Sequence, residues 1–256
     1  MSKPVKRAMG LDIGGSGVKA AVVDIRSGKL TSQRVRLKTP QPATPTAVLE
    51  VAARIRRKLD WEGPVGCGFP GSFRDGKVSR APNLDPSWIG QSLAGELRRS
   101  LGVDRVAIGN DADAAGLAEI RLGAGRGVGG TVVLVTLGTG IGTAVFNDGI
   151  LLPGTELGHL EMAGREAETV ASESAKNCNN LSWKRWGAIL GRYLAHLEYL
   201  LHVDLFIIGG GASKKADKFM GQLETVGCEV VVAQMGNLAG IVGAALMVAE
   251  SPDPAG

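Results

Sequence analysis

The chain has 256 residues, of which 44% are hydrophobic, and a formal net charge of +4. This length is enough to bury a full core, in one large domain or in two lobes of about 100 to 150 residues. The sequence has no uncharged apolar run of about 18 residues and no apolar signal core in its N-terminus MSKPVKRAMG, so we expect a cytoplasmic protein with no transmembrane helix and no membrane partner.

The cysteines argue against two kinds of site, and the charge does not identify a class of ligand. Cys67, Cys178 and Cys228 are too widely spaced for a disulfide framework or a zinc pattern. The small basic excess is typical of a solvated surface and also suits a polyanionic ligand. Charge alone does not choose between nucleic acid and polyphosphate.

Residues 6–24 predict a strand, a glycine turn and a second strand. Asp12 ends the first strand, where a carboxylate can hold Mg²⁺ directly or through water, because this ion prefers oxygen ligands. The bare amides of a glycine turn can approach phosphate, and nearby hydroxyl and ammonium groups can reach its oxygens. The candidate phosphate-binding residues here are Gly14, Gly15, Ser16, Gly17 and Lys19. The alternative is a plain β-hairpin with a solvated Lys19.

The next stretch predicts helices on either side of a turn region. Residues 47–59 have the apolar spacing of an amphipathic helix. Residues 76–88 are expected to form a loop, and residues 92–101 another short helix.

A further strand ends at Gly109, and Asp113 is expected to cap a helix that continues to Leu122. Asn110 and Asp111 therefore lie at a strand-to-helix junction, the usual place for a site in an α/β fold. A helix cap alone would also explain one acidic residue at this point.

Residues 131–146 repeat the order of strand, glycine turn and strand. A dinucleotide-binding fingerprint needs its glycines to open a helix, so this order argues against a Rossmann site. Gly138, Thr139 and Gly140 are instead candidates for binding phosphate through amides and a hydroxyl. An ordinary β-turn is the alternative.

Glu156 and His159 follow in a glycine-flanked loop, three residues apart. A carboxylate accepts hydrogen bonds and an imidazole accepts or donates them, so the pair suits a ligand rich in hydroxyl groups.

The C-terminal part predicts a long helix over residues 181–202, capped by Ser182, and a buried strand over residues 204–208 that ends in glycines. The broad apolar stripe of the helix is expected to be core or a homodimer face. Residues 230–233 predict the last strand, and residues 237–249 a helix rich in small residues.

Five motifs together resemble one family, from Leu11 to about Ala249. They are DIGGSGVK, LGTGIGTAVF, IIGGGASKKADKF, the Asn110–Asp111 pair and the Glu156–His159 segment. They resemble the ROK family of sugar kinases, most closely the short branch that phosphorylates glucose with polyphosphate. The resemblance implies an α/β, actin-like ATPase (ribonuclease H-like) fold, with two lobes and a cleft between them. We expect a small lobe over residues 1–109 and a large lobe over residues 110–256, with the C-terminal helix packing back on the first.

The resemblance also implies roles at the sugar. Asp111 would be the catalytic base that takes the proton of a sugar 6-hydroxyl, since phosphoryl transfer otherwise depends on alignment and charge neutralisation. The other sugar-binding residues would be Asn83, Asn110, Glu156, His159 and Glu168. Glu166 is a rival for the role of Glu168, and Asn83 would alternatively hold its own turn.

For the donor, the resemblance implies that the two glycine hairpins hold phosphates and that Mg²⁺ near Asp12 neutralises charge. Gly210 and Gly211 would approach the donor. Lys214 and Lys215, with Lys218, offer a track for a long polyanion, and the alternative is a solubilising helix face.

Many members of the family carry a Cys-x-Cys-Gly-x-x-Gly-Cys zinc motif after the Gly-His step. This chain has Cys178 alone in that region. Because structural zinc needs about four ligands, we expect none, which leaves His159 to the sugar.

The sequence therefore predicts a kinase that transfers a phosphoryl group from polyphosphate, with ATP as a second donor, to the 6-hydroxyl of glucose. No helix-turn-helix precedes Leu11, so we expect no nucleic-acid partner. Two alternatives stay open: a strictly ATP-dependent hexose or N-acetylhexosamine kinase, and a non-catalytic sugar-binding sensor.

Overall fold

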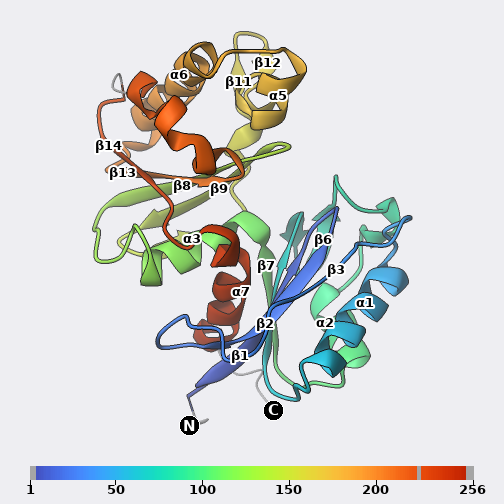
Figure 1. Ribbon diagram of the computed structural model, residues 1–256. Coiled ribbons are helices and arrows are strands. Elements are labelled where there is room, and N and C mark those ends of the chain that lie inside the picture. Colours follow the sequence, from blue (N-terminus) through green and yellow to red (C-terminus); the bar gives the residue numbers. More distant parts are fainter. Residues whose placement is uncertain (1–3, 224–225, 252–256) are drawn as a thin grey trace. The chain divides into compact units, whose positions relative to one another are not determined.

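The computed structural model describes residues 4–223 and 226–251 (Figure 1). The chain forms two compact units, unit 1 from Met1–Ala118 with Leu238–Gly256 and unit 2 from Glu119–Asn237. The predicted lobes, 1–109 and 110–256, differ from these units at residues 110–118 and 238–256. No helix in the described ranges is long and apolar enough to cross a membrane.

Unit 1 is built on a five-stranded mixed sheet. Its order is β3-β2-β1-β4-β7, where β1, β2 and β3 pair antiparallel and β1, β4 and β7 pair parallel. The bounds are β1 Arg7–Ile13, β2 Val18–Asp24, β3 Val35–Leu37, β4 Val65–Phe69 and β7 Val106–Asn110. The predicted strand, turn and strand over residues 6–24 are confirmed.

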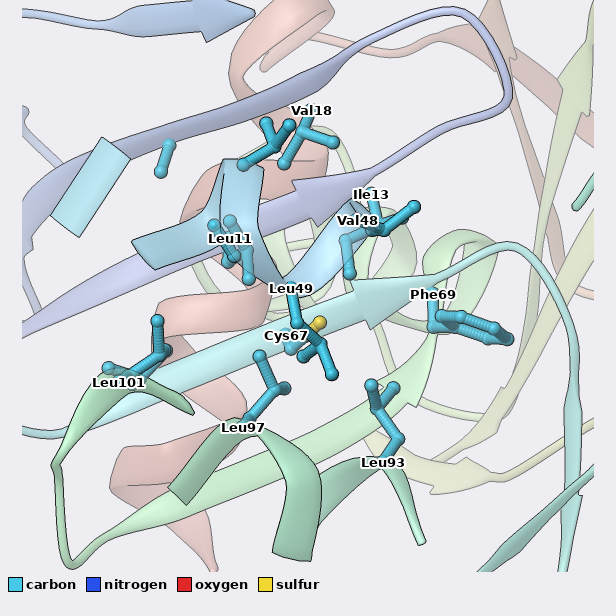
Figure 2. Close-up of a cluster of buried hydrophobic side chains, with 14 of the residues drawn as sticks. Leu11, Ile13, Val18, Val48, Leu49, Cys67, Phe69, Leu93, Leu97 and Leu101 are labelled. Atoms are coloured by element: carbon cyan, nitrogen blue, oxygen red, sulfur yellow. The ribbon is translucent and has the colours of Figure 1, made fainter. Parts of the chain in front are cut away.

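Helices cover both faces of this sheet. On one side, α1 (Pro45–Lys58) and α2 (Leu93–Leu101) share a core with the strands, and Figure 2 shows Leu11, Cys67 and Leu97 within it. On the other side, α7 (Ala239–Glu250) packs against β1, β4 and β7 (Figure 1). Because side chains alternate along a strand, the residues on either side of Leu11 face α7.

Unit 2 repeats the same sheet order. Its sheet is β10-β9-β8-β13-β14, with an antiparallel β8–β9 hairpin and parallel pairing of β8, β13 and β14. The bounds are β8 Thr131–Leu137, β9 Ile141–Asn147, β10 Ile150–Leu152, β13 Leu205–Gly210 and β14 Glu229–Val232. The second predicted strand, turn and strand are therefore also confirmed.

The long helix α6 (Trp183–Leu201) supplies much of the core of unit 2. Ser182 caps it, as predicted, by accepting a hydrogen bond from the Arg185 amide at 3.2 Å. Most of its apolar stripe is buried, including Trp186, Leu190 and Tyr193, while Tyr199 and Leu200 near its end are exposed.

Two local predictions were wrong. The expected loop over residues 76–88 contains a strand and a short helix, because the β5–β6 hairpin pairs across residues 72–80. The helix after β7, α3 (Asp111–Leu122), begins before Asp113, so Asp113 is a buried residue of its first turn and not its cap.

The remaining short elements lie in loops between the units' main strands and helices. They are β5 Ser72–Arg74, β6 Lys77–Arg80, η1 Pro86–Trp88, η2 Leu157–His159, β11 Glu161–Met162, β12 Arg165–Glu166, α4 Glu168–Ala171, α5 Glu173–Cys178, η3 Ala212–Lys218, η4 Met220–Gln222 and η5 Gly236–Leu238.

The approach of α7 to the sheet depends on glycine. A Cβ atom on Gly10 would lie 1.8 Å from the carbonyl oxygen of Ile241, and one on Gly66 would lie 1.6 Å from that of Ala244. A Cβ on Gly243 would lie 1.5 Å from the Ala114 carbonyl oxygen of α3. Backbone therefore lies directly on backbone at these points, with no room for a side chain.

We predict that Gly66→Ala lowers the free energy of unfolding by about 2–3 kcal/mol, because the added methyl group meets a fixed carbonyl. Urea unfolding of the purified variant measures this loss. The matched control is Gly221→Ala, where a Cβ atom meets nothing within 4 Å. Equal stability of the two variants would contradict the close packing of α7.

Candidate functional site

The first glycine turn is a tight hairpin between β1 and β2. The Gly14 amide donates to the Gly17 carbonyl at 3.1 Å, and the Gly17 amide donates to the Gly14 carbonyl at 3.3 Å. A Cβ atom on Gly15 at the tip would lie 3.1 Å from the Asn83 carbonyl oxygen. The structure thus brings two predicted site residues, Gly15 and Asn83, side by side in unit 1.

The ionic groups of this hairpin pair with each other. Lys19 Nζ donates to Asp12 Oδ2 at 2.9 Å, since the two residues are opposite in the β1–β2 register. A Cβ on Gly240 would lie 3.0 Å from the Asp12 carboxylate, so the first turn of α7 faces that carboxylate. Lys19 is therefore paired and about one-third exposed.

Arg36 is a neighbour that the sequence analysis missed. It lies opposite Lys19 in the β2–β3 register, and its Nη2 donates to the Ser16 carbonyl at 3.5 Å. A Cβ on Gly17 would lie 2.8 Å from its Nε. No sequence signal marks it, because only strand pairing brings residue 36 to a turn at residues 14–17.

Asn110 and Asp111 occupy the junction of β7 and α3. Asn110 Oδ1 accepts from the amides of Ala112 at 2.7 Å and Asp113 at 3.3 Å, and its Nδ2 donates to the Gly71 carbonyl at 3.2 Å. Asn110, and not Asp113, is thus the cap of α3. Asp111 is part-buried in the first helical turn, where the helix dipole favours a negative charge.

The second glycine turn is joined to Glu168. The Gly138 amide donates to the Gly140 carbonyl at 3.1 Å, and the Ile141 amide donates to Glu168 Oε2 at 3.3 Å. A Cβ on Gly140 would lie 2.4 Å from that oxygen. A predicted sugar-binding carboxylate therefore lies directly against the predicted phosphate turn in unit 2.

The loop that carries Glu156 and His159 is fixed to β9. Thr143 Oγ1 donates to the Thr155 carbonyl at 3.1 Å and accepts from the Leu157 amide at 3.1 Å. A Cβ on Gly158 would lie 2.3 Å from the Ile141 carbonyl oxygen, so this glycine lets the loop lie on the strand. These contacts set the position of the imidazole that follows.

His159 lies beside two carboxylates. Its Nδ1 is 3.1 Å from Glu166 Oε2 and 3.8 Å from Glu168 Oε1. In the described part of the chain this is the one group of three His, Cys, Asp or Glu side chains close enough to share an ion, with ligand atoms within 4.8 Å of one another. It offers no thiolate and is one ligand short of a structural zinc site. The expectation of no structural zinc stays a prediction.

Gly210 and Gly211 meet the end of β8. Gly210 has a φ of 78°, and a Cβ atom there would lie 2.4 Å from the Leu137 carbonyl oxygen. The exposed Lys214, Lys215 and Lys218 follow on η3, where Asp217 lies among them. The positive charge of this segment is therefore partly offset by one carboxylate.

A cavity of about 430 Å³ lies elsewhere in unit 2, between the β11–β12 hairpin and α6. Its lining residues are Glu161, Met162, Ala163, Arg165, Val170, Ile189, Arg192 and His196. None of the predicted sugar or phosphate residues lines it, although the β11–β12 hairpin on its wall also carries Glu166.

The chain is similar to known proteins over nearly its whole length. The model of the ROK family matches residues 8–180. The chain is 47% identical over 241 residues to the polyphosphate glucokinase of Mycobacterium tuberculosis, covering 94% of this chain and 91% of that protein.

Two solved structures are similar along their full length. The inorganic polyphosphate/ATP-glucomannokinase from Arthrobacter sp. strain KM matches with a TM-score of 0.90 and 46% identity, covering 96% of this chain and 99% of that one. A ROK family glucokinase from Streptomyces griseus, in complex with glucose and AMPPNP, matches with a TM-score of 0.81 and 25% identity, covering 96% of this chain and 100% of that one. These similarities confirm the predicted α/β, actin-like ATPase fold.

We predict that Asn110→Ala lowers the free energy of unfolding by about 1–2 kcal/mol, because α3 loses its cap. Asn110→Asp keeps the capping oxygen and loses only the bond to Gly71, so its effect should be smaller. Urea unfolding measures both variants. A loss in Asn110→Asp as large as in Asn110→Ala would show that the cap is not what Asn110 supplies.

Proposed function

Because the chain belongs to the ROK family, we propose that it is a polyphosphate-dependent glucokinase, with ATP as a second phosphoryl donor. The observation that carries this proposal is 47% identity over 94% of the chain to a polyphosphate glucokinase. The similarity to a polyphosphate/ATP-glucomannokinase over 96% of the chain supports the two donors and makes mannose a second sugar to test.

In the proposed reaction Asp111 is the base. A sugar 6-hydroxyl is a poor nucleophile until a positioned carboxylate accepts its proton as the bond to phosphorus forms. Two observations support this role: β7 and the Asn110 cap fix the backbone of Asp111, and its side chain is only part-buried.

The remaining proposed sugar contacts are asparagines, carboxylates and one imidazole. Asn83 and Asn110 in unit 1 would contact hydroxyl groups, although the Asn110 amide is already engaged as a cap and a bridge. In unit 2, Glu156, His159 and Glu168 offer acceptors and an imidazole, which suits a polyhydroxyl ligand. Glu168 also contacts the second hairpin, so it would link sugar and donor.

The donor phosphates would be held by the glycine hairpins. Gly14, Gly15, Ser16 and Gly17 supply one turn, and Gly138, Thr139 and Gly140 the other, with Gly210 and Gly211 next to the latter. Lys19 would exchange its ion pair with Asp12 for a phosphate oxygen.

The residues near Asp12 fit a Mg²⁺ ion that has one protein ligand and takes its other ligands from water and phosphate. Asp12 supplies one carboxylate, and among the described residues it belongs to no group of three acidic, His or Cys side chains. An ion that keeps most of its waters and binds the donor phosphates needs no more than this. When bound, Mg²⁺ would neutralise phosphate charge, and Lys19 would be released toward the donor.

We also propose that the enzyme acts in the cytoplasm as a homodimer. The exposed Tyr199 and Leu200 at the end of α6 are candidates for the contact, because 80% and 51% of their surfaces are accessible in one chain. Sedimentation at several protein concentrations measures the oligomeric state.

The first test is glucose 6-phosphate formation with Mg²⁺ and either polyphosphate or ATP. Asp111→Asn should lower kcat by about 10²- to 10⁴-fold, because it removes the base, while glucose binding measured by calorimetry persists. Asp104→Asn, an exposed substitution in the same unit, should leave kcat unchanged. Glucose binding with no turnover by the wild-type enzyme would support the sensor, and turnover with ATP alone would support the strictly ATP-dependent kinase.

The lysine track has its own test. Lys214→Ala with Lys215→Ala should raise the KM for long-chain polyphosphate about three- to tenfold, and less for ATP, because a long polyanion extends past the glycine turn. The effect should shrink at high salt. The control is Lys184→Ala with Arg185→Ala, which removes two exposed cations from α6. Equal effects of the two double variants would show that Lys214 and Lys215 are ordinary surface lysines with no specific role in polyphosphate binding.

A further inference from the structure

The imidazole of His159 has a defined partner on one of its nitrogens. Nδ1 lies 3.1 Å from Glu166 Oε2, within hydrogen-bond distance. A carboxylate accepts hydrogen bonds only, so the proton of this bond belongs to Nδ1. In the neutral ring the other nitrogen, Nε2, is then an acceptor.

Glu166, and not Glu168, is the carboxylate that accepts the hydrogen bond from Nδ1 of His159. Glu168 Oε1 is 3.8 Å from Nδ1, beyond a hydrogen bond, while its Oε2 accepts from the Ile141 amide at 3.3 Å. Glu168 is thus oriented toward the second glycine turn. The two carboxylates of the group have different tasks.

The backbone of Glu166 is fixed on both sides. Thr169 Oγ1 donates to the Glu166 carbonyl at 2.7 Å, and the Ala167 amide donates to the Leu160 carbonyl at 2.8 Å. Its strand β12 pairs with β11 directly after the loop that carries His159. A carboxylate held from a hairpin beside its partner loses less freedom on forming the bond than a free side chain would.

We infer that Glu166 is a positioning residue that holds His159 with its proton on Nδ1, and so presents Nε2 as an acceptor to a sugar hydroxyl. This inference rests on the proposed function, which supplies the sugar. It gives Glu166 a role at His159 in place of the direct sugar contact that was the alternative to Glu168. The other charged groups nearby are Glu168, Glu161 opposite Glu166 in the hairpin, and Arg165. Glu161 has the same charge and strand environment, which makes it the matched control.

The test reads the tautomer directly. The chain has three histidines, so ¹⁵N NMR of imidazole-labelled protein is simple, and the signals missing from His159→Gln identify His159. In the wild type, Nδ1 should be the protonated nitrogen and Nε2 the unprotonated one. In Glu166→Ala the proton should redistribute toward Nε2, and Glu161→Ala should match the wild type.

Kinetics supply the second readout. Glu166→Ala should raise the KM for glucose about tenfold with a smaller change in kcat, because a charge-assisted hydrogen bond that orients the acceptor is lost. Glu166→Gln, whose amide oxygen still accepts from Nδ1, should recover most of the affinity. The Glu166 side chain is 54% exposed, so the variants should fold, and their unfolding temperatures check this.

Three results would overturn the inference. They are a wild-type His159 protonated on Nε2, a Glu166→Ala spectrum identical to the wild type, and a wild-type spectrum that changes when a chelator removes a bound metal. The spectra need no turnover, so the tautomer can be established even if the protein phosphorylates no sugar. That outcome would reject the proposed function and keep the positioning role.

Discussion

Direct contact between the backbone of α7 and the sheet of unit 1 is the constraint on which the donor-side residues depend. The carbonyls of Ile241 and Ala244 lie where side chains of Gly10 and Gly66 would be. Because β1 and β4 are held at this distance, the first turn of α7 faces the Asp12 carboxylate at the end of β1. A larger residue at either glycine would displace the helix and the carboxylate together.

Glycines also allow close packing in unit 2, here of loops and side chains against a strand and a turn. Gly158 lets the loop of Glu156 and His159 lie on β9, and Gly140 leaves space for the Glu168 carboxylate. This loop and the second glycine turn are therefore packed together and are not two independent loops. The common sheet order of the two units explains why a glycine hairpin occurs at the same place in each.

Polar side chains in both units are paired with one another. Lys19 is bonded to Asp12, and His159 to Glu166. Partly exposed pairs of this kind contribute at most about 1 kcal/mol each, so a phosphate can compete for Lys19 at small cost. The pairs hold these side chains in place weakly enough to be exchanged, which is compatible with the ligand-binding roles proposed for Lys19 and His159.

The sequence by itself determined the two strand-turn-strand units, the Asn110–Asp111 junction and the capped helix α6, because glycine turns, caps and apolar periodicity are local signals. Its motif resemblance also identified the family and the fold. Only the tertiary structure decided that Arg36 lies over the first turn, and that Glu166 pairs with His159 while Glu168 pairs with the Ile141 amide. These are contacts between segments apart in the chain, set by strand register and by the packing of loops on strands, and no local pattern encodes them.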